Sequence, residues 1–273
     1  MPEPLVPPAL VTGSGPPVVL LHAFPLDGRM WAPQVEALST AFTVIVPDLR
    51  GFGAARGAVV DPEAAQLGEG AWMDLLADDV ALLLDRLEIE RAVVAGLSLG
   101  GYLAFALWRR HAERISALAL ISTRPGQDSE AAARNRLEMA ERVGEDGVAF
   151  VPTVMLPRLL GETSRSTRPE VVERVTRLII EQSPAGVAAA QRGMATRADS
   201  TATLASIDVP TLVVAGAEDE IIPVDDAKLL ATAVRNGRLV EIESAGHLVN
   251  LEQAERLNQL VYQFVSEPGQ STQ

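Results

Sequence analysis

The sequence predicts an α/β fold, in which helices cover both faces of a mostly parallel sheet. Short runs rich in Val, Leu and Ile, bounded by turn residues, occur at residues 18–22, 43–47, 92–97, 117–122, 211–216 and 238–242. Most of these runs lack polar alternation, which is typical of strands that are covered on both faces. Amphipathic helical patterns at 31–38, 72–87 and 251–264 alternate with them, and this alternation favours a parallel sheet.

The alternation stops after Ser122 and resumes at Val209. The stretch between them has helical patterns at 129–143, 148–156, 169–182 and 185–194, with Pro and Gly breaks. We therefore expect residues 124–204 to form an inserted helical cap, and residues 1–123 and 205–273 to form the core domain. A separate domain is the alternative, but entry and exit between adjacent strands fits a lid better. The tail, 267–273, is expected to be loose.

Composition excludes several classes of function. The 273 residues are 48% apolar and 22% charged, which is ordinary for a globular protein. The formal net charge of −13 disfavours nucleic acid and anionic membrane surfaces as partners. The absence of Cys excludes disulfides, thiolate metal sites and a cysteine nucleophile.

The location predicted from the sequence is the cytoplasm. The N-terminal segment has no basic residue before its apolar part and is interrupted by prolines, unlike a secretory signal. Residues 92–108 are uncharged, but they contain the turn signal GLSLGG, which favours a buried strand followed by a buried helix over a membrane span.

The strongest chemical signal is the G-x-S-x-G pattern at residues 96–100, between a predicted strand and an apolar helix. In such a sharp turn the serine adopts a strained conformation and the glycines avoid collisions, so Ser98 is presented at the edge of the sheet. The helix N-terminus and the free backbone N–H of Leu99 would stabilise a developing oxyanion there. The pattern alone could also be a glycine-rich packing turn, and its position between strand and helix favours the nucleophile.

A serine nucleophile needs an imidazole base and an orienting carboxylate. Of the three histidines, His247 follows the last predicted strand and lies on a loop at the same sheet edge as Ser98. His22 ends the first strand, and His111 follows two arginines at a helix end, where a cation suits the helix dipole.

The carboxylate is expected at the end of the strand at residues 211–216, where Ala217-Glu218-Asp219-Glu220 follows. The order Ser98, Asp219, His247 matches that of hydrolases that use this turn. Glu218 and Glu220 are the alternatives, since an acidic loop is usually solvated surface. A second oxyanion donor is expected after the first strand, at the backbone N–H of Phe24, because Pro25 cannot donate.

Five motifs in this order resemble the α/β-hydrolase family over nearly the whole chain outside the cap. They are HAFPLDG (22–28), DLRGFG (48–53), GLSLGG (96–101), GAEDEIIP (216–223) and SAGHLVNLE (244–252). The resemblance implies the α/β-hydrolase fold, with one or two antiparallel strands near residues 4–12 and a sheet of about eight strands. It also implies Ser98 as nucleophile, His247 as base and then acid, Asp219 as orienting carboxylate, and the Phe24 and Leu99 amides as the oxyanion hole.

Within that family the HAFPL loop and the segment around STRPGQDSEAAARNR (122–136) are similar to the subgroup of enol-lactonases, small-ester carboxylesterases and cofactor-free haloperoxidases or perhydrolases. It departs from the common pattern in having Ala23 after His22, where Gly is usual, and Ala54 after DLRGFG, where Ser is frequent. Pro25 slightly favours the haloperoxidases or perhydrolases, because the proteins of that subgroup often have Pro after the oxyanion residue. A Ser98 nucleophile argues against dehalogenases and epoxide hydrolases, which attack with an aspartate.

The function predicted is hydrolysis of a carboxylic ester or lactone of a small, largely apolar substrate through an acyl-enzyme. Trp31, Met155 and Leu248, with Phe24 and Leu99, are candidates to line the substrate site. No metal or organic cofactor is required, and the sequence leaves open whether the chain forms a homo-oligomer. The alternatives are perhydrolysis or cofactor-free halogenation, and a non-catalytic small-molecule receptor of the same fold.

Overall fold

The computed structural model describes residues 2–267, so nearly all of the predicted loose tail, 267–273, lies outside the described residues. Seven strands form one sheet in the order β1-β3-β2-β4-β5-β6-β7. Their bounds are β1 Ala9–Thr12, β2 Pro17–Leu21, β3 Thr43–Pro47, β4 Ala92–Leu97, β5 Ile115–Ile121, β6 Thr211–Gly216 and β7 Gly237–Ile242. Only β1 runs antiparallel, beside β3, and the other pairs within the described chain are parallel.

The sheet has one strand fewer than the expected eight or so. The segment before β1 has no strand in residues 2–8, and it contains Pro4, Pro7 and Pro8. Proline has no N–H to donate to a strand ladder, which explains why pairing begins only at Ala9.

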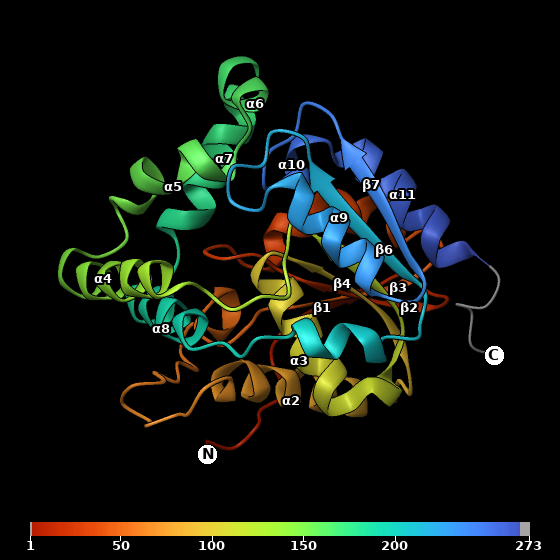
Figure 1. Cartoon of the computed structure of the whole chain (residues 1–273), viewed down its shortest axis with the longest axis horizontal. Helices are drawn as coiled ribbons and strands as arrows, with labels where there is room; N and C mark the ends of the chain where they lie inside the picture. Colours follow the sequence, from red (N-terminus) through yellow and green to blue (C-terminus); the bar gives the residue numbers. More distant parts are fainter. Residues whose placement is uncertain (1, 268–273) are drawn as a thin grey trace.

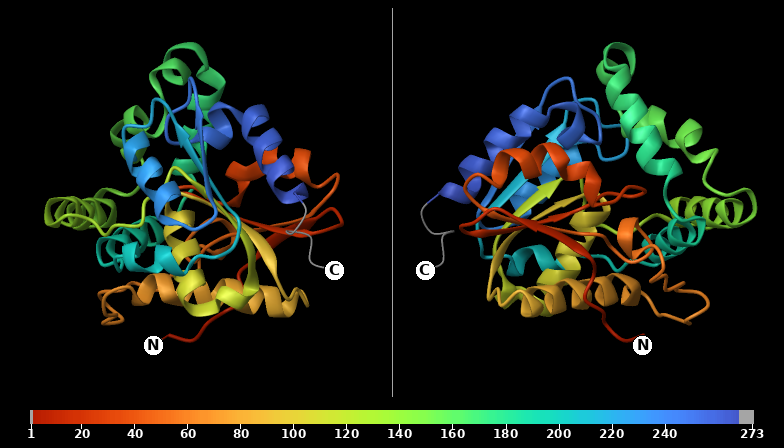
Figure 2. Two further views of the ribbon diagram at one scale, coloured as in Figure 1. Left: turned by 45° about the vertical axis from the view of Figure 1, so that its right-hand side comes forward. Right: turned by 180° about the vertical axis from the view of Figure 1, so that it is seen from behind.

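Helices cover the sheet on both sides. α2 (Ala71–Arg86) and α3 (Leu99–His111) pack together on one face, and α1 (Ala32–Leu38) and α11 (Ala254–Ser266) pack together on the other (Figures 1 and 2). α9 (Val224–Ala233) packs on β6 and β7, and α10 (Val249–Glu252) leads into α11.

Five helices are inserted between β5 and β6 and gather on one side of the molecule (Figure 1). They are α4 (Glu130–Asp146), α5 (Val151–Leu159), α6 (Glu162–Thr167), α7 (Pro169–Ile180) and α8 (Pro184–Ala195). Four of them agree with the predicted helical patterns, and α6 was not predicted. Its sequence, ETSRST, has no apolar residue and therefore no amphipathic period to detect.

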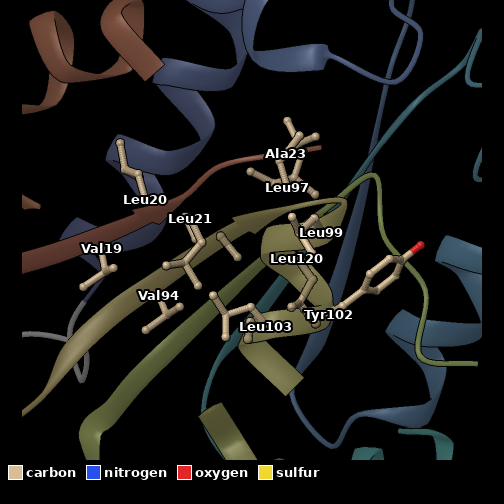
Figure 3. Packing of buried hydrophobic residues seen from close by; sticks show 14 of the residues in the cluster. Val19, Leu20, Leu21, Ala23, Val94, Leu97, Leu99, Tyr102, Leu103 and Leu120 are labelled. Carbon is tan, nitrogen blue, oxygen red and sulfur yellow. The ribbon is translucent and has the colours of Figure 1, made fainter. Parts of the chain in front are cut away.

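The centre of the core lies where β2, β4 and β5 meet the start of α3. β4 and β5 are buried along their entire length, as expected for strands between two helix layers. Figure 3 shows Leu21, Leu97, Leu103 and Leu120 packed around the turn that joins β4 to α3. This rigid packing fixes the position of the residues at the end of β4.

No helix between residues 2 and 267 combines the length and the apolar content needed to cross a membrane.

Candidate active site

The turn between β4 and α3 holds Ser98 in a strained backbone conformation, with φ 55° and ψ −109°. Four hydrogen bonds hold its backbone: Ser98 N donates to Ile121 O at 2.9 Å, and Ser98 O accepts from Gly101 N at 2.9 Å, Tyr102 N at 3.1 Å and Thr123 Oγ1 at 3.0 Å. A non-glycine residue at positive φ costs energy that the surrounding structure must offset, and such residues cluster at functional sites.

The two glycines of the motif are required by close backbone approach. A Cβ atom on Gly96 would lie 2.2 Å from the Gly100 carbonyl oxygen, and one on Gly100 would lie 2.2 Å from the Leu21 carbonyl oxygen. Backbone atoms cannot move aside as the end of a side chain can, so the turn needs glycine at both positions.

Asp219 and His247 form a buried pair. His247 Nδ1 lies 2.8 Å from Asp219 Oδ2, and both side chains are almost completely inaccessible to solvent. The other carboxylate oxygen, Oδ1, accepts the backbone N–H groups of Ile221 at 2.8 Å and Ile222 at 3.0 Å. The aspartate is therefore held on both oxygens, and its contact with Nδ1 leaves Nε2 of His247 as the free ring nitrogen.

Electrostatics keep this carboxyl group ionised. Burial alone would raise the pKa of Asp219, but the attraction of His247, its hydrogen bond and the two backbone N–H donors hold that pKa below its usual value. A buried carboxylate stays charged only when it is paired and hydrogen-bonded, and this one is both.

The neighbouring acids point elsewhere. Glu218 accepts the backbone N–H of Thr163 at 2.9 Å and its hydroxyl at 2.5 Å. Glu220 is exposed and lies 3.9 Å from Arg165. Of the three acids in the loop after β6, Asp219 is therefore the one hydrogen-bonded to His247.

Ser98, Asp219 and His247 follow β4, β6 and β7, whose carboxyl ends lie at the same edge of the sheet. Among the described residues no hydrogen bond joins Ser98 Oγ to His247, so the structure pairs the aspartate with the histidine and leaves the serine apart. In unliganded enzymes such contacts are often long and tighten when substrate binds.

The loop after β2 is fixed by His22. Its Nε2 accepts the backbone N–H of Leu49 at 3.0 Å, so Nδ1 carries the proton and donates to Ala23 O at 3.1 Å. Burial lowers the pKa of His22, which keeps it neutral, as these two contacts require. In the described chain, no hydrogen bond uses the backbone N–H of Phe24 or of Leu99.

The third histidine, His111, contacts neither Ser98 nor Asp219 among the described residues. His111 Nε2 lies 2.8 Å from Asp78 Oδ1 at the end of α3, which is a contact between a helix end and the neighbouring helix α2.

The predicted substrate-lining residues have different environments. Trp31 and Leu248 are almost completely buried in the main hydrophobic core. Met155 is half-buried and lines a cavity of about 430 Å³ between α4, α5 and the loop after β6.

One buried residue at the site was missed by the sequence analysis. The Glu252 carboxylate accepts three backbone N–H groups, from Gly246 at 3.0 Å, Leu248 at 3.1 Å and Gly161 at 2.8 Å. It thereby joins the loop that carries His247 to the segment between α5 and α6. Burial raises the pKa of Glu252 despite these bonds. The signal in the sequence was an acid at the end of the otherwise uncharged run LVNLE.

No group of three or more His, Asp or Glu side chains in the described part of the chain is arranged to hold a metal ion.

Comparison with known proteins identifies the family. A sequence profile described as the alpha/beta hydrolase fold matches residues 16–254. The chain belongs to the α/β-hydrolase family. Its relatives are hydrolases, so it is an enzyme of this family, and the reading as a non-catalytic receptor is not retained.

Three proteins with named activities are similar to this chain. A thermophilic esterase from Thermogutta terrifontis, solved with malate bound, is 41% identical with a TM-score of 0.88, over 94% of this chain and 92% of that one. The 3-oxoadipate enol-lactonase 1 of Acinetobacter baylyi is 28% identical over 92% of this chain and 89% of its own. A putative non-heme chloroperoxidase of Synechocystis is 28% identical over 93% and 92%.

Proposed function

We propose that this α/β hydrolase is a serine hydrolase that cleaves a carboxylic ester or lactone through an acyl-enzyme intermediate. The observation that carries the proposal is the buried pair of Asp219 and His247, at the sheet edge that also presents Ser98 on its strained turn. The esterase and enol-lactonase relatives support the same chemistry.

In this reaction Ser98 Oγ attacks the carbonyl carbon while His247 Nε2 accepts the hydroxyl proton. Asp219 holds Nδ1–H and stabilises the imidazolium that forms. The negative charge on the tetrahedral oxygen is met by the backbone N–H groups of Phe24 and Leu99. His247 then returns its proton to the leaving alcohol, and water attacks the acyl-enzyme by the same steps to release the acid and regenerate Ser98.

The helices from α4 to α8 take the part of a cap in this proposal, with residues 1–123 and 205–273 as the core domain. Leu248 N donates to Leu159 O at 3.2 Å, so the inserted helices are joined directly to the histidine loop. A cap in this position would exclude water from the acyl-enzyme and shape the substrate site.

Replacing Ser98 with Ala tests the proposal. Turnover of short p-nitrophenyl esters should be abolished while the unfolding temperature stays near that of the wild type. An organophosphate should label the wild-type protein at the peptide containing Ser98. Retained turnover in a purified Ser98→Ala preparation would remove this residue from the mechanism.

Perhydrolysis is the second candidate, favoured by the chloroperoxidase relative and by Pro25 after the proposed oxyanion residue. Here hydrogen peroxide replaces water at the acyl-enzyme and releases a peracid. Adding peroxide and acetate and measuring peracid formation separates it from hydrolysis, and Ser98→Ala is the control in the same assay.

A further inference from the structure

A cavity of about 430 Å³ between α4, α5 and the loop after β6 is lined by several arginines. Arg124, Arg136 and Arg158 line it, and Asp128 is the one acid among its described lining residues. The chain as a whole carries a formal net charge of −13, so this concentration of guanidinium groups is a local reversal of sign. From the sequence we expected a largely apolar substrate, because few cationic residues lie near the ends of the motifs.

The aspartate is already more than neutralised. Its side chain is almost fully buried and meets Arg124 at 3.0 Å, Arg197 at 2.8 Å and Arg136 at hydrogen-bond distance. Burial would raise the pKa of Asp128, but the guanidinium groups hold it below the usual value. One carboxylate therefore faces three guanidinium groups, and positive charge remains for another anion.

Two of the arginines have donors that no protein group among the described residues uses. Nε of Arg124 is buried without a hydrogen-bond partner. Arg158 is exposed on α5, and none of the ion pairs in the described chain includes it. A guanidinium group matches the two oxygens of a carboxylate, and an unpaired buried donor is costly unless a ligand meets it.

Two residues that line the cavity, Arg124 and Ile221, are connected to the proposed catalytic residues. Arg124 directly follows Thr123, whose hydroxyl donates to the Ser98 carbonyl at 3.0 Å. Ile221, another lining residue, donates its N–H to Asp219 at 2.8 Å. A ligand in the cavity would therefore contact residues that are linked to the serine turn and to the aspartate loop.

We infer that this cavity is a subsite for a carboxylate, and that the preferred ester or lactone carries a free carboxylate on a short aliphatic chain. This deepens the proposed function and rests on it. Met155 and Ile221 give the same cavity apolar surface for the chain, and its volume is within the range of small-molecule sites.

The test compares two substrates that differ at one end of the chain: the p-nitrophenyl monoester of glutaric acid, which carries a negative charge, and its methyl ester, which carries one more methyl group and no charge. The wild type should have the higher kcat/KM for the acid, with an advantage that shrinks as salt is added. Arg158→Gln should reduce kcat/KM for the acid roughly tenfold, mainly through KM, and leave the methyl ester unchanged.

Arg134→Gln is the matched control. Arg134 lies on α4 and is exposed, its one ion pair within residues 2–267 is with Glu130 at 3.7 Å, and it does not line the cavity. Both substrates should be hydrolysed by this variant as by the wild type. Because Arg158 does not pair with Asp128, a purely structural role for the arginines predicts no substrate-dependent change in Arg158→Gln.

Equal kcat/KM for the two substrates, or an Arg158→Gln effect of the same size on both, would overturn the subsite while Ser98-dependent hydrolysis still stood. Calorimetric binding of glutarate to Ser98→Ala is an independent readout. Binding that disappears in the Ser98→Ala, Arg158→Gln double variant supports the subsite without any turnover. Absence of binding to Ser98→Ala counts against it.

Discussion

Replacing Asp219 with Asn should abolish most of the activity by changing which nitrogen of His247 carries the proton. Asp219 Oδ1 accepts two backbone N–H groups, from Ile221 and Ile222, whereas Oδ2 meets only His247 Nδ1. The asparagine carbonyl must therefore stay on the two backbone donors. The opposite orientation would leave both of them facing an NH₂ group, at about 1–3 kcal/mol for each unsatisfied donor.

In that orientation the amide NH₂ faces Nδ1 of His247, which must become an acceptor, so the ring proton moves to Nε2. Nε2–H cannot take the proton of Ser98. The variant loses base catalysis, which is worth roughly 100- to 10 000-fold in kcat. The hydrogen bond between the residues survives with its direction reversed, so the free energy of unfolding should change by only about 1 kcal/mol.

Initial rates with p-nitrophenyl butyrate, together with urea unfolding, test this reasoning. Glu220→Gln is the matched control, because Glu220 is exposed and its only ion pair in the described chain is 3.9 Å long. It should keep wild-type kcat and stability. An Asp219→Asn variant with kcat within a fewfold of the wild type would refute the assignment of Asp219 as the orienting carboxylate. An inactive Glu220→Gln variant would instead assign that role to Glu220.

Three further predictions concern the framework around the site. Glu252→Ala leaves the buried N–H groups of Gly161 and Gly246 without an acceptor and should cost at least about 2 kcal/mol in urea unfolding, while exposed Glu255→Ala should change stability by less than about 0.5 kcal/mol. Gly100→Ala places a Cβ 2.2 Å from Leu21 O and should lower the unfolding free energy by about 1–3 kcal/mol. Burial lowers the pKa of His22, so the unfolded chain binds a proton first as pH falls; stability should be complete above about pH 6.5 and decline below it. Urea unfolding at several pH values should show this decline, with a smaller slope in His22→Asn.

The central strands could be predicted because burial on both faces leaves a mark in composition. β4 and β6 match the predicted ranges 92–97 and 211–216 at both ends. β1 has no such mark, since its four residues are exposed or half-buried at the edge of the sheet, and it was expected only from the family resemblance. α6 escaped prediction because it has no apolar face.

The pairing of Asp219 with His247 was expected from the order of the loops along the chain, and the structure places these two side chains 2.8 Å apart. The role of Glu252 could not be predicted in the same way. Its three partners lie on two segments, of which Gly161 is distant in sequence, and only folding brings that segment against the histidine loop.

The positions of the central strands along the chain, the serine turn and the candidate residues at strand ends were determined by the sequence alone, because backbone sterics and hydrophobic periodicity act over short stretches of chain. The tertiary structure decided which side chains come together: Glu252 at the histidine loop, and Arg124 and Arg158 in the lining of one cavity. Charge and hydrogen bonding act through space, between residues whose separation along the chain carries no information about their distance.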